Sequence, residues 1–346
     1  MASGLEPMTQ ATTQASTGGA GTPAKVLASN PAPSKALERA VWLALGAVCV
    51  YIISTGSASA LNTIELTAIL ALFASGTNIL VGQTGLLSFC QAAFYGESAY
   101  TLGILLKHNV SFGLALIGAL ALAVISSVIV GIVLLRTRHL YFALASLAVS
   151  QLAEAVAVTQ YSLTGGNNGL FGFTLPSWLS GTRSLAWIIV LTAIVGIAVV
   201  IAVEKSTFGI MLRAVRDRRD RTASFGVSPL VYEVGAFAIA GGICGLAGCL
   251  ALVQTSGATP DMASWTASAV PVMACVIGGM YSISGPIIGA VVYEVIYTYV
   301  LNGSADWEIV FGAVLILIVL FAPRGVADLA KRLGARILPE GGRRHG

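Results

Sequence analysis

The amino-acid sequence predicts an all-α membrane protein that crosses the bilayer about ten times, and three observations carry this prediction. First, 56% of the 346 residues are hydrophobic and only 10% are charged, whereas soluble domains carry about 25% charged residues. Second, the apolar residues gather in runs close to the ~20 residues that a helix needs to cross a hydrocarbon core of ~30 Å. Third, the basic residues are distributed unequally between the segments that separate these runs. Helices are expected because a backbone inside lipid must satisfy its own hydrogen bonds.

The apolar runs define the expected crossings, which begin near Ala40, Leu61, Leu86, Phe112, Leu140, Leu185, Val231, Ala267, Ile287 and Ile309. The runs at 267–280 and 309–322 are shorter than a usual spanning helix. Hydropathy alone therefore also allows re-entrant segments at these two places.

The basic residues favour ten crossings with a cytoplasmic N-terminus. Lys and Arg beside membrane helices are retained on the cytoplasmic side, and this topology places all 19 basic residues there except Lys107 and Arg183. Merging residues 267–301 into one crossing would move the basic C-terminal tail to the outside. Orientation and anionic lipid headgroups explain the net charge of +4, so no nucleic-acid partner is expected.

The chain divides into three regions. Residues 1–38 are rich in Ala, Ser, Thr, Gly and Pro and lack an apolar run, which indicates a disordered cytoplasmic tail. Residues 39–325 form the transmembrane domain, and residues 326–346 form a basic cytoplasmic C-terminal tail.

The largest cytoplasmic loop, at 204–230, carries the most informative motif. An Arg-Ala-x-Arg-Asp segment at 213–217 is followed by Ala-x-x-Gly at 223–226. The first part contains helix-forming residues, and Gly226 followed by Pro229 is a helix stop signal. We expect a short amphipathic helix at the membrane surface that ends in a glycine turn. A solvated basic face that serves only to orient the chain is the alternative.

These residues resemble the coupling-loop signature of the permease subunits of branched-chain amino acid ABC transporters, in which the loop docks in a groove on the ATPase subunit. The matching positions are Arg213, Ala214, Arg216, Asp217, Ala223 and Gly226. The sequence departs from the signature at Arg218 and Arg219, where acidic or amide residues are common, and at Thr222, where Ala is usual. The resemblance therefore implies ATPase docking without fixing its side-chain contacts.

Further stretches resemble the same family in the same order. They are residues 78–88 with their continuation to Tyr100, the Leu-Thr-Gly-Gly loop at 163–169, the Gly-Gly and Gly-Pro pairs within 277–289, and Phe-Ala-Pro-Arg-Gly at 321–325. Together they span roughly residues 72–326 and are similar to the longer, LivM-like of the two permease types. The resemblance implies a fold of the ABC-importer permease type.

The glycine-interrupted stretches also have a physical use. Glycine permits close helix approach and positive φ, so these residues can break helices and expose backbone groups to a polar ligand. Ordinary close packing is the alternative for each glycine. The candidates for the substrate pathway are Asn78, Gly82, Gln83, Gly85, Ser88, Glu97, Gly278, Gly279 and Gly285. The candidates for docking a binding protein on the outer face are Thr164, Gly165, Gly166, Asn168 and Gly169.

Carboxylates within apolar runs are costly and are therefore candidates for function. They are Glu65, Glu97, Glu154, Glu233 and Glu294. Glu97 is the strongest because it follows the 82–85 glycine break, and interior pairing or interfacial placement is the alternative. The cysteines and histidines show no metal-ligand or catalytic spacing, so neither a metal site nor an enzyme active site is expected.

The chain has no Gly-x4-Gly-Lys-Ser/Thr segment, so it is not expected to be its own ATPase. The resemblance implies a non-catalytic importer subunit in the bacterial inner membrane with both termini cytoplasmic. It also implies a heterodimer with a second permease, two partner subunits that bind ATP and Mg, and a periplasmic substrate-binding protein. The implied substrate is a branched-chain or related amino acid, or a small amide or urea. A gradient-driven secondary carrier for a small polar solute is the alternative, and a membrane-embedded enzyme ranks third.

Overall fold

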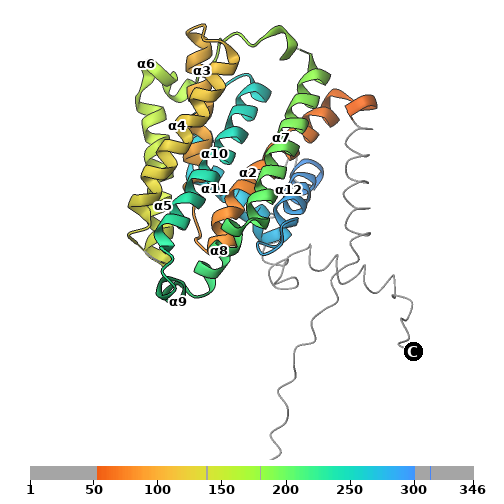
Figure 1. Cartoon of the computed structure of the whole chain (residues 1–346). Coiled ribbons are helices and arrows are strands. Elements are labelled where there is room, and N and C mark those ends of the chain that lie inside the picture. Colours follow the sequence, from red (N-terminus) through yellow and green to blue (C-terminus); the bar gives the residue numbers. More distant parts are fainter. Residues whose placement is uncertain (1–52, 138, 180, 301–311, 313–346) are drawn as a thin grey trace, which may run out of the picture.

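Figure 1 shows the computed structural model of the chain, which describes residues 53–137, 139–179, 181–300 and 312. Within these residues every regular element is a helix, apart from one isolated antiparallel bridge between Leu170 and Ala258. Five of the described helices are long and apolar enough to cross a membrane. The predicted all-α membrane class is confirmed.

The long helices are α2 (Ala58–Asn78), α4 (Phe112–Leu134), α5 (His139–Thr159), α7 (Thr182–Lys205) and α10 (Pro229–Thr255). Helix α2 continues as one π-helical segment, η1 (Ile79–Thr84). The shorter crossing elements are α3 (Gln91–Lys107), α11 (Trp265–Gly278), and α12 (Gly285–Val295) with η5 (Ile296–Val300).

Each predicted crossing from the one near Leu61 to the one near Ile287 corresponds to one of these helices. The crossings expected near Ala40 and Ile309, the motif at 321–325 and the tails at 1–38 and 326–346 lie outside the described residues. The total of ten crossings therefore stays a prediction.

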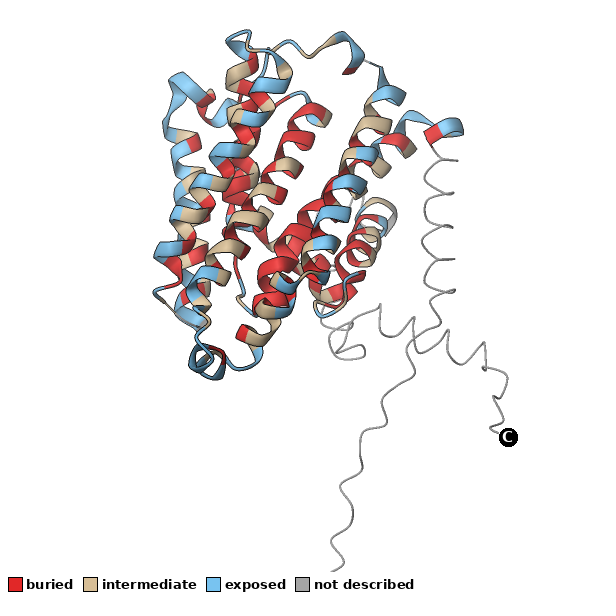
Figure 2. Ribbon diagram, viewed as in Figure 1, coloured by how far each residue is buried: buried red, intermediate tan, exposed pale blue. Residues whose placement is uncertain are grey.

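Helix α10 forms the centre of the bundle, and α2, α3 and α4 pack around it. Small residues on α10 allow this close packing: a Cβ atom at Gly248 would overlap the Tyr95 carbonyl of α3, and one at Gly241 would overlap Ser127 of α4. Figure 2 shows the result, since α10 is largely buried whereas α4 and α5 expose one side along their length.

The two ends of the bundle carry different elements (Figure 1). The α9 end carries α8 (Thr207–Asp217) and α9 (Arg219–Ser224). The α6 end carries α6 (Tyr161–Thr164), η2 (Gly166–Asn168) and η3 (Ser177–Leu179). Arg136 follows α4, and Lys205 ends α7 directly before the arginines of α8 and α9, where these helices reach the α9 end. Lys107 ends α3 and Arg183 lies in the first turn of α7, where these helices reach the α6 end. The described basic residues are thus separated by end as the sequence predicts.

The crossing that contains α3 is an interrupted helix. Gly85 adopts φ +73°, and residues 85–90 are not helical. The Phe89 N–H donates to the Ser146 hydroxyl at 2.9 Å, and the Phe89 carbonyl accepts from the Ser150 hydroxyl at 2.8 Å. Hydroxyls of α5 thus replace the missing helical partners. The helix predicted to start near Leu86 therefore begins only at Gln91.

The segment 256–264, which includes η4 (Pro260–Ala263), enters the bundle from the α6 end. Ala258 pairs with Leu170 through hydrogen bonds of 2.7 and 3.0 Å. Farther along, Ala263 abuts Gly96 of α3, and the Ser268 hydroxyl accepts from the Ala92 N–H at 2.8 Å. The chain thus passes Gly96 before α11 begins and meets Ala92 in the first turns of α11. Helix α11 therefore begins beside α3 rather than at the α6 end of the bundle.

Candidate functional site

Helix α8 starts at a serine cap and lies across the α9 end. The Ser206 hydroxyl accepts a hydrogen bond from the Gly209 N–H at 3.4 Å, which satisfies one of the free amides at a helix start. Leu212 and Val215 are buried, whereas Asp217 is exposed. This division into an apolar and a polar face anchors α8 on the bundle as a surface helix.

The sequence predicts one helix up to the glycine turn, whereas the structure has two. Arg218 adopts an extended backbone (φ −152°, ψ 82°) between α8 and α9. The Thr222 hydroxyl donates to the Ala214 carbonyl at 3.1 Å and so holds α9 against α8. Arg219 forms an ion pair of 3.0 Å with Glu233 of α10. Thr222 and Arg219, which both depart from the family signature, therefore fasten α9 in place.

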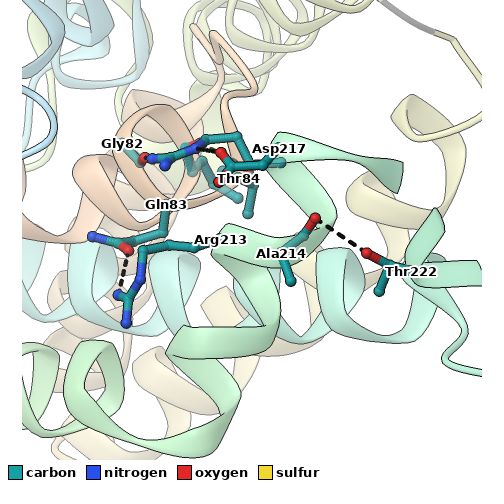
Figure 3. A network of polar contacts seen from close by, with 9 residues as sticks. Gly82, Gln83, Thr84, Arg213, Ala214, Asp217 and Thr222 are labelled. Carbon is teal, nitrogen blue, oxygen red and sulfur yellow. Dashed lines mark hydrogen bonds and ion pairs between the residues drawn. The ribbon is translucent and has the colours of Figure 1, made fainter. Parts of the chain in front are cut away.

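Two arginines of α8 bind the C-terminal end of the continuous helix formed by α2 and η1 (Figure 3). Arg213 Nη1 donates to Gln83 Oε1 at 2.9 Å and to the Glu204 carbonyl at 3.0 Å. Arg216 Nη1 donates to the Gly82 carbonyl at 2.5 Å. Cations are favourable at the C-terminal end of a helix, where backbone carbonyls lack helical partners.

The tip of the α11–α12 hairpin reaches the same place. The Arg216 guanidinium lies 5.1 Å from the centroid of the Tyr281 ring. A Cβ atom at Gly82 would overlap the neighbouring Met280 carbonyl. Backbone contact at this point thus requires glycine.

The hairpin itself depends on glycines. A Cβ atom at Gly278 would overlap the Gly285 carbonyl, and one at Gly289 would overlap the Ala274 carbonyl. Gly279 adopts φ +107°, a conformation that L side chains rarely adopt. These glycines therefore serve close helix packing, the alternative that the sequence leaves open, and they also bring the hairpin tip to η1.

We name the set of Gly82, Gln83, Arg213, Arg216 and Tyr281 the α8 junction. It unites three groups of predicted residues that are far apart in sequence: the 78–88 stretch, the Arg-Ala-x-Arg-Asp segment and the late glycine pairs. Asn78 and the Glu204 carboxylate are buried beside Gln83. Ser88 lies apart from the junction, in a buried polar group with Cys90 at 3.2 Å and Gln91 at 3.4 Å.

The outer side of α9 is open. Ala223 and Gly226 are exposed, and Gly226 has φ +81° with no atom within 4 Å of a Cβ position. Phe225 is 87% exposed, an unusual position for an aromatic side chain at the tip of a charged loop. Sequence reasoning missed Phe225, although a single large apolar residue between Ser224 and Gly226 is a visible signal.

The residues predicted to receive a binding protein lie together at the α6 end. The Thr164 hydroxyl donates to the Ala157 carbonyl at 2.6 Å. Gly165, Gly166 and Gly169 all have positive φ, which tight turns require, and Asn168 is exposed. The Leu170–Ala258 bridge attaches this loop to the segment 256–264.

The carboxylates in the apolar runs have different surroundings. Glu97 accepts a hydrogen bond of 2.5 Å from the Ser126 hydroxyl, which joins α3 to α4. Glu233 pairs with Arg219, Glu294 accepts from Thr298 at 3.4 Å, and Glu65 is buried in α2. Glu154 is half-buried and accepts from Gln151 at 3.1 Å.

A bundle of apolar helices with interrupted crossings, joined at one end to a basic surface segment, defines a polytopic membrane permease. The chain belongs to the family described as branched-chain amino acid transport system, permease component, whose pattern matches residues 59–320. This match confirms the family resemblance inferred from the motifs. No group of His, Cys, Asp and Glu side chains suited to a metal ion occurs among the described residues.

Curated relatives agree with the family match. The chain is 24% identical over 312 residues to the high-affinity branched-chain amino acid transport system permease protein LivM of Salmonella typhimurium, covering 81% of this chain and 72% of the relative. It is 23% identical over 320 residues to the Escherichia coli protein of the same name, covering 84% and 74%. A probable LivM protein of Methanocaldococcus jannaschii is 22% identical over 261 residues, covering 69% and 75%. No solved structure matches the chain.

Proposed function

We propose that this chain is the LivM-like transmembrane subunit of an ATP-driven importer. Its cargo is a branched-chain or related amino acid, or a small amide or urea, which moves from the periplasm to the cytoplasm. Family membership and the printed names of the relatives support this proposal. The chain contributes the pathway and the docking surfaces, and no catalytic group.

The α8 junction is the observation that carries the proposal. An importer must pass nucleotide-driven movement of its ATPases to the helices that line the pathway, which requires a stiff element between the two. Arg213 and Arg216 connect α8 to the end of η1 through charge-assisted hydrogen bonds, and such bonds contribute about 1.5–3 kcal/mol each. The surface offered to an ATPase is the exposed face of α9 with Ala223, together with Phe225 and Gly226, which directly follow this helix.

The remaining partners follow from the family. A second permease subunit completes a heterodimer, two further subunits bind ATP and Mg²⁺, and a periplasmic protein delivers the substrate at the α6 end. The α9 end, which carries most of the described basic residues, faces the cytoplasm by the positive-inside rule. We accordingly infer that the protein lies in the bacterial inner membrane with both termini cytoplasmic.

Uptake by the complete complex in proteoliposomes tests this function. When the α9 end faces the vesicle lumen, leucine should accumulate in the lumen only if ATP is enclosed there. Accumulation should continue when ionophores abolish proton and sodium gradients. Uptake driven by an ion gradient without ATP would instead identify a secondary carrier. A disulfide between F225C and a cysteine in the ATPase groove tests the docking surface directly.

A further inference from the structure

Helix α5 differs from α4 and α7 in the polarity of its exposed side. On α4 and α7 the exposed positions along the middle of the helix are apolar, among them Ile117, Ile125, Ile129, Leu191, Ile194 and Val195. On α5 the exposed side also carries Gln151, with Glu154 half-buried beside it. With a rise of 1.5 Å per residue, Gln151 lies about 18 Å along the helix from His139 and about 12 Å from Thr159, and Glu154 lies about 8 Å from Thr159. Gln151 therefore lies well within the length of α5, and Glu154 lies nearer its α6 end.

Lipid tails offer no hydrogen-bond partner to such a pair. Gln151 Nε2 donates to Glu154 Oε2 at 3.1 Å, so the two side chains satisfy each other only in part. Carboxylates within a membrane helix nearly always face protein or a water-filled cavity. The exposed side of α5 is therefore not a lipid surface along its whole length.

A second carboxylate lies between the two ends of the bundle on a different element. Ala263 of η4 abuts Gly96 of α3, and Gly96 is about 16 Å along the helix axis from Lys107 at the α6 end. Asp261, two residues before Ala263, is exposed. Irregular backbone at membrane depth is tolerated only where protein buries it or where it lines water. An exposed Asp261 there favours water.

The elements that carry these two features are neighbours. The η4 segment packs against both α5 and α3. The Asp261 carboxylate is within electrostatic range of Tyr100 on α3, whose hydroxyl is buried without a hydrogen-bond partner among the described residues. Unlike Glu97 and Glu233, which accept from Ser126 and Arg219, these two carboxylates border exposed surface.

We propose that Gln151 and Glu154 of α5, together with Asp261 of η4, line an aqueous route that attracts the ammonium group of the transported substrate. The inference rests on the proposed import function and narrows its substrate class. Two carboxylates beside low-dielectric walls concentrate cations. An amino acid carries an ammonium group, whereas urea and simple amides carry none, so this lining favours amino acids.

Thiol labelling of the complete complex in membrane vesicles tests the inference without requiring transport. The reporter is A155C, an exposed position next to Glu154, and the control is A121C on the outer side of α4. The unmodified chain serves as the blank, since its described cysteines are buried. The probes are two methanethiosulfonates of similar size, one with a trimethylammonium group and one with a sulfonate group.

The reporter should react with both probes while A121C stays unreactive. Because a thiolate reacts intrinsically faster with a cationic reagent, each rate is divided by the rate of that probe with 2-mercaptoethanol in solution. After this division the cationic probe should react roughly tenfold faster at the reporter. Adding Glu154→Gln and Asp261→Asn to the reporter should remove that preference. An unreactive reporter means that lipid or another subunit covers this side of α5, which overturns the inference. Equal divided rates for the two probes also overturn it.

The labelling result and the test of the proposed function can fail independently. ATP-driven leucine uptake with an unreactive reporter refutes only the lining of the route. Cation-selective labelling in a complex whose uptake follows an ion gradient refutes ATP-driven import and leaves the lining intact.

Discussion

The Arg216 guanidinium donates a hydrogen bond to the Gly82 carbonyl oxygen at 2.5 Å, joining residues 134 positions apart in the chain. Gly82 lies in the last turn of η1, and Arg216 lies in the last turn of α8. The contact connects α8, part of the segment that we propose docks on an ATPase, with a helix of the bundle. Arginine residues of the motif thus point inward, and α9 supplies the outward surface.

Replacing Arg216 by Ala should uncouple uptake from ATP hydrolysis. The loss of one charge-assisted hydrogen bond of about 1.5–3 kcal/mol loosens α8 from η1, so leucine uptake should fall about tenfold to a hundredfold while ATP hydrolysis continues. The matched control is Arg221→Ala, because Arg221 is exposed on α9. Equal effects of the two variants, measured as uptake per ATP hydrolysed, would show that net charge rather than the Gly82 contact matters.

Gly226 should tolerate asparagine and reject valine. Its φ of +81° is costly for a β-branched residue, whereas Asn adopts left-handed backbone more readily. Because no neighbouring atom lies within 4 Å of a Cβ position, any effect comes from backbone strain. Gly226→Val should lower substrate-stimulated ATP hydrolysis and uptake together at normal membrane levels, and Gly226→Asn should retain most of both.

Ala223→Glu should weaken ATPase docking without affecting insertion. Ala223 is exposed on α9, so a carboxylate there meets water in the free subunit and meets the partner surface in the complex. Co-purification of the ATPase with the membrane subunits measures the effect, and Asp220→Glu serves as a control for added bulk on the same short helix. Normal co-purification and uptake would exclude this face of α9 from the docking surface.

Gly278→Ala should reduce the amount of folded protein. The added Cβ would overlap the Gly285 carbonyl in the hairpin, and forcing atoms into a packed site typically costs 1–3 kcal/mol. Gly113→Ala in the first turn of α4 is the control, since nothing lies within 4 Å of a Cβ there. Thermal unfolding of the detergent-solubilised complex should separate the two variants by several degrees, and equal unfolding temperatures would contradict the hairpin packing.

Much of the fold follows from the sequence because a bilayer imposes simple rules. Apolar runs of spanning length place α2, α4, α5, α7 and α10 within a few residues. The interruptions are harder to predict, since residues 85–90 depend on hydroxyls of Ser146 and Ser150. Ser146 and Ser150 lie about 60 residues farther along the chain. In the sequence they are indistinguishable from other small residues of a helix.

The sequence predicts which residues belong to the candidate site, but it does not predict which of them contact one another. The motif predicts that Arg216 lies in a coupling segment, but nothing in the sequence joins it to Gly82. The glycine content also predicts a helix break at Gly82, whereas this residue lies inside η1 and the break begins at Gly85. Glu97, ranked first among the carboxylates from the sequence, illustrates the same point. Its hydrogen-bond partner Ser126 belongs to another helix, so the sequence does not reveal the pair.

Cysteine labelling should assign the two ends to opposite sides of the membrane. Single cysteines at exposed positions between Thr164 and Arg183 should react with an impermeant reagent from the periplasm, and those between Lys205 and Val227 only after permeabilisation. Asn168→Cys and Phe225→Cys suit this experiment, since both side chains are exposed. Reaction of both from the same side would refute the alternation of crossings.

The loop at the α6 end should determine how the binding protein docks. Asn168 is exposed and lies between glycines with positive φ, so Asn168→Trp adds bulk outward without disturbing the turn. Its expected effect is a decrease of about tenfold in the affinity of the binding protein for the reconstituted complex, equivalent to about 1.4 kcal/mol. Ser184→Trp, at an exposed position at the start of α7, is the control for added bulk at the same end.

Gly166→Val should have a larger effect through the loop itself, because its φ is +62° and its Cβ would crowd the Tyr161 ring. Unchanged binding and uptake with both loop variants would show that these residues serve only as a connector between α5 and α7.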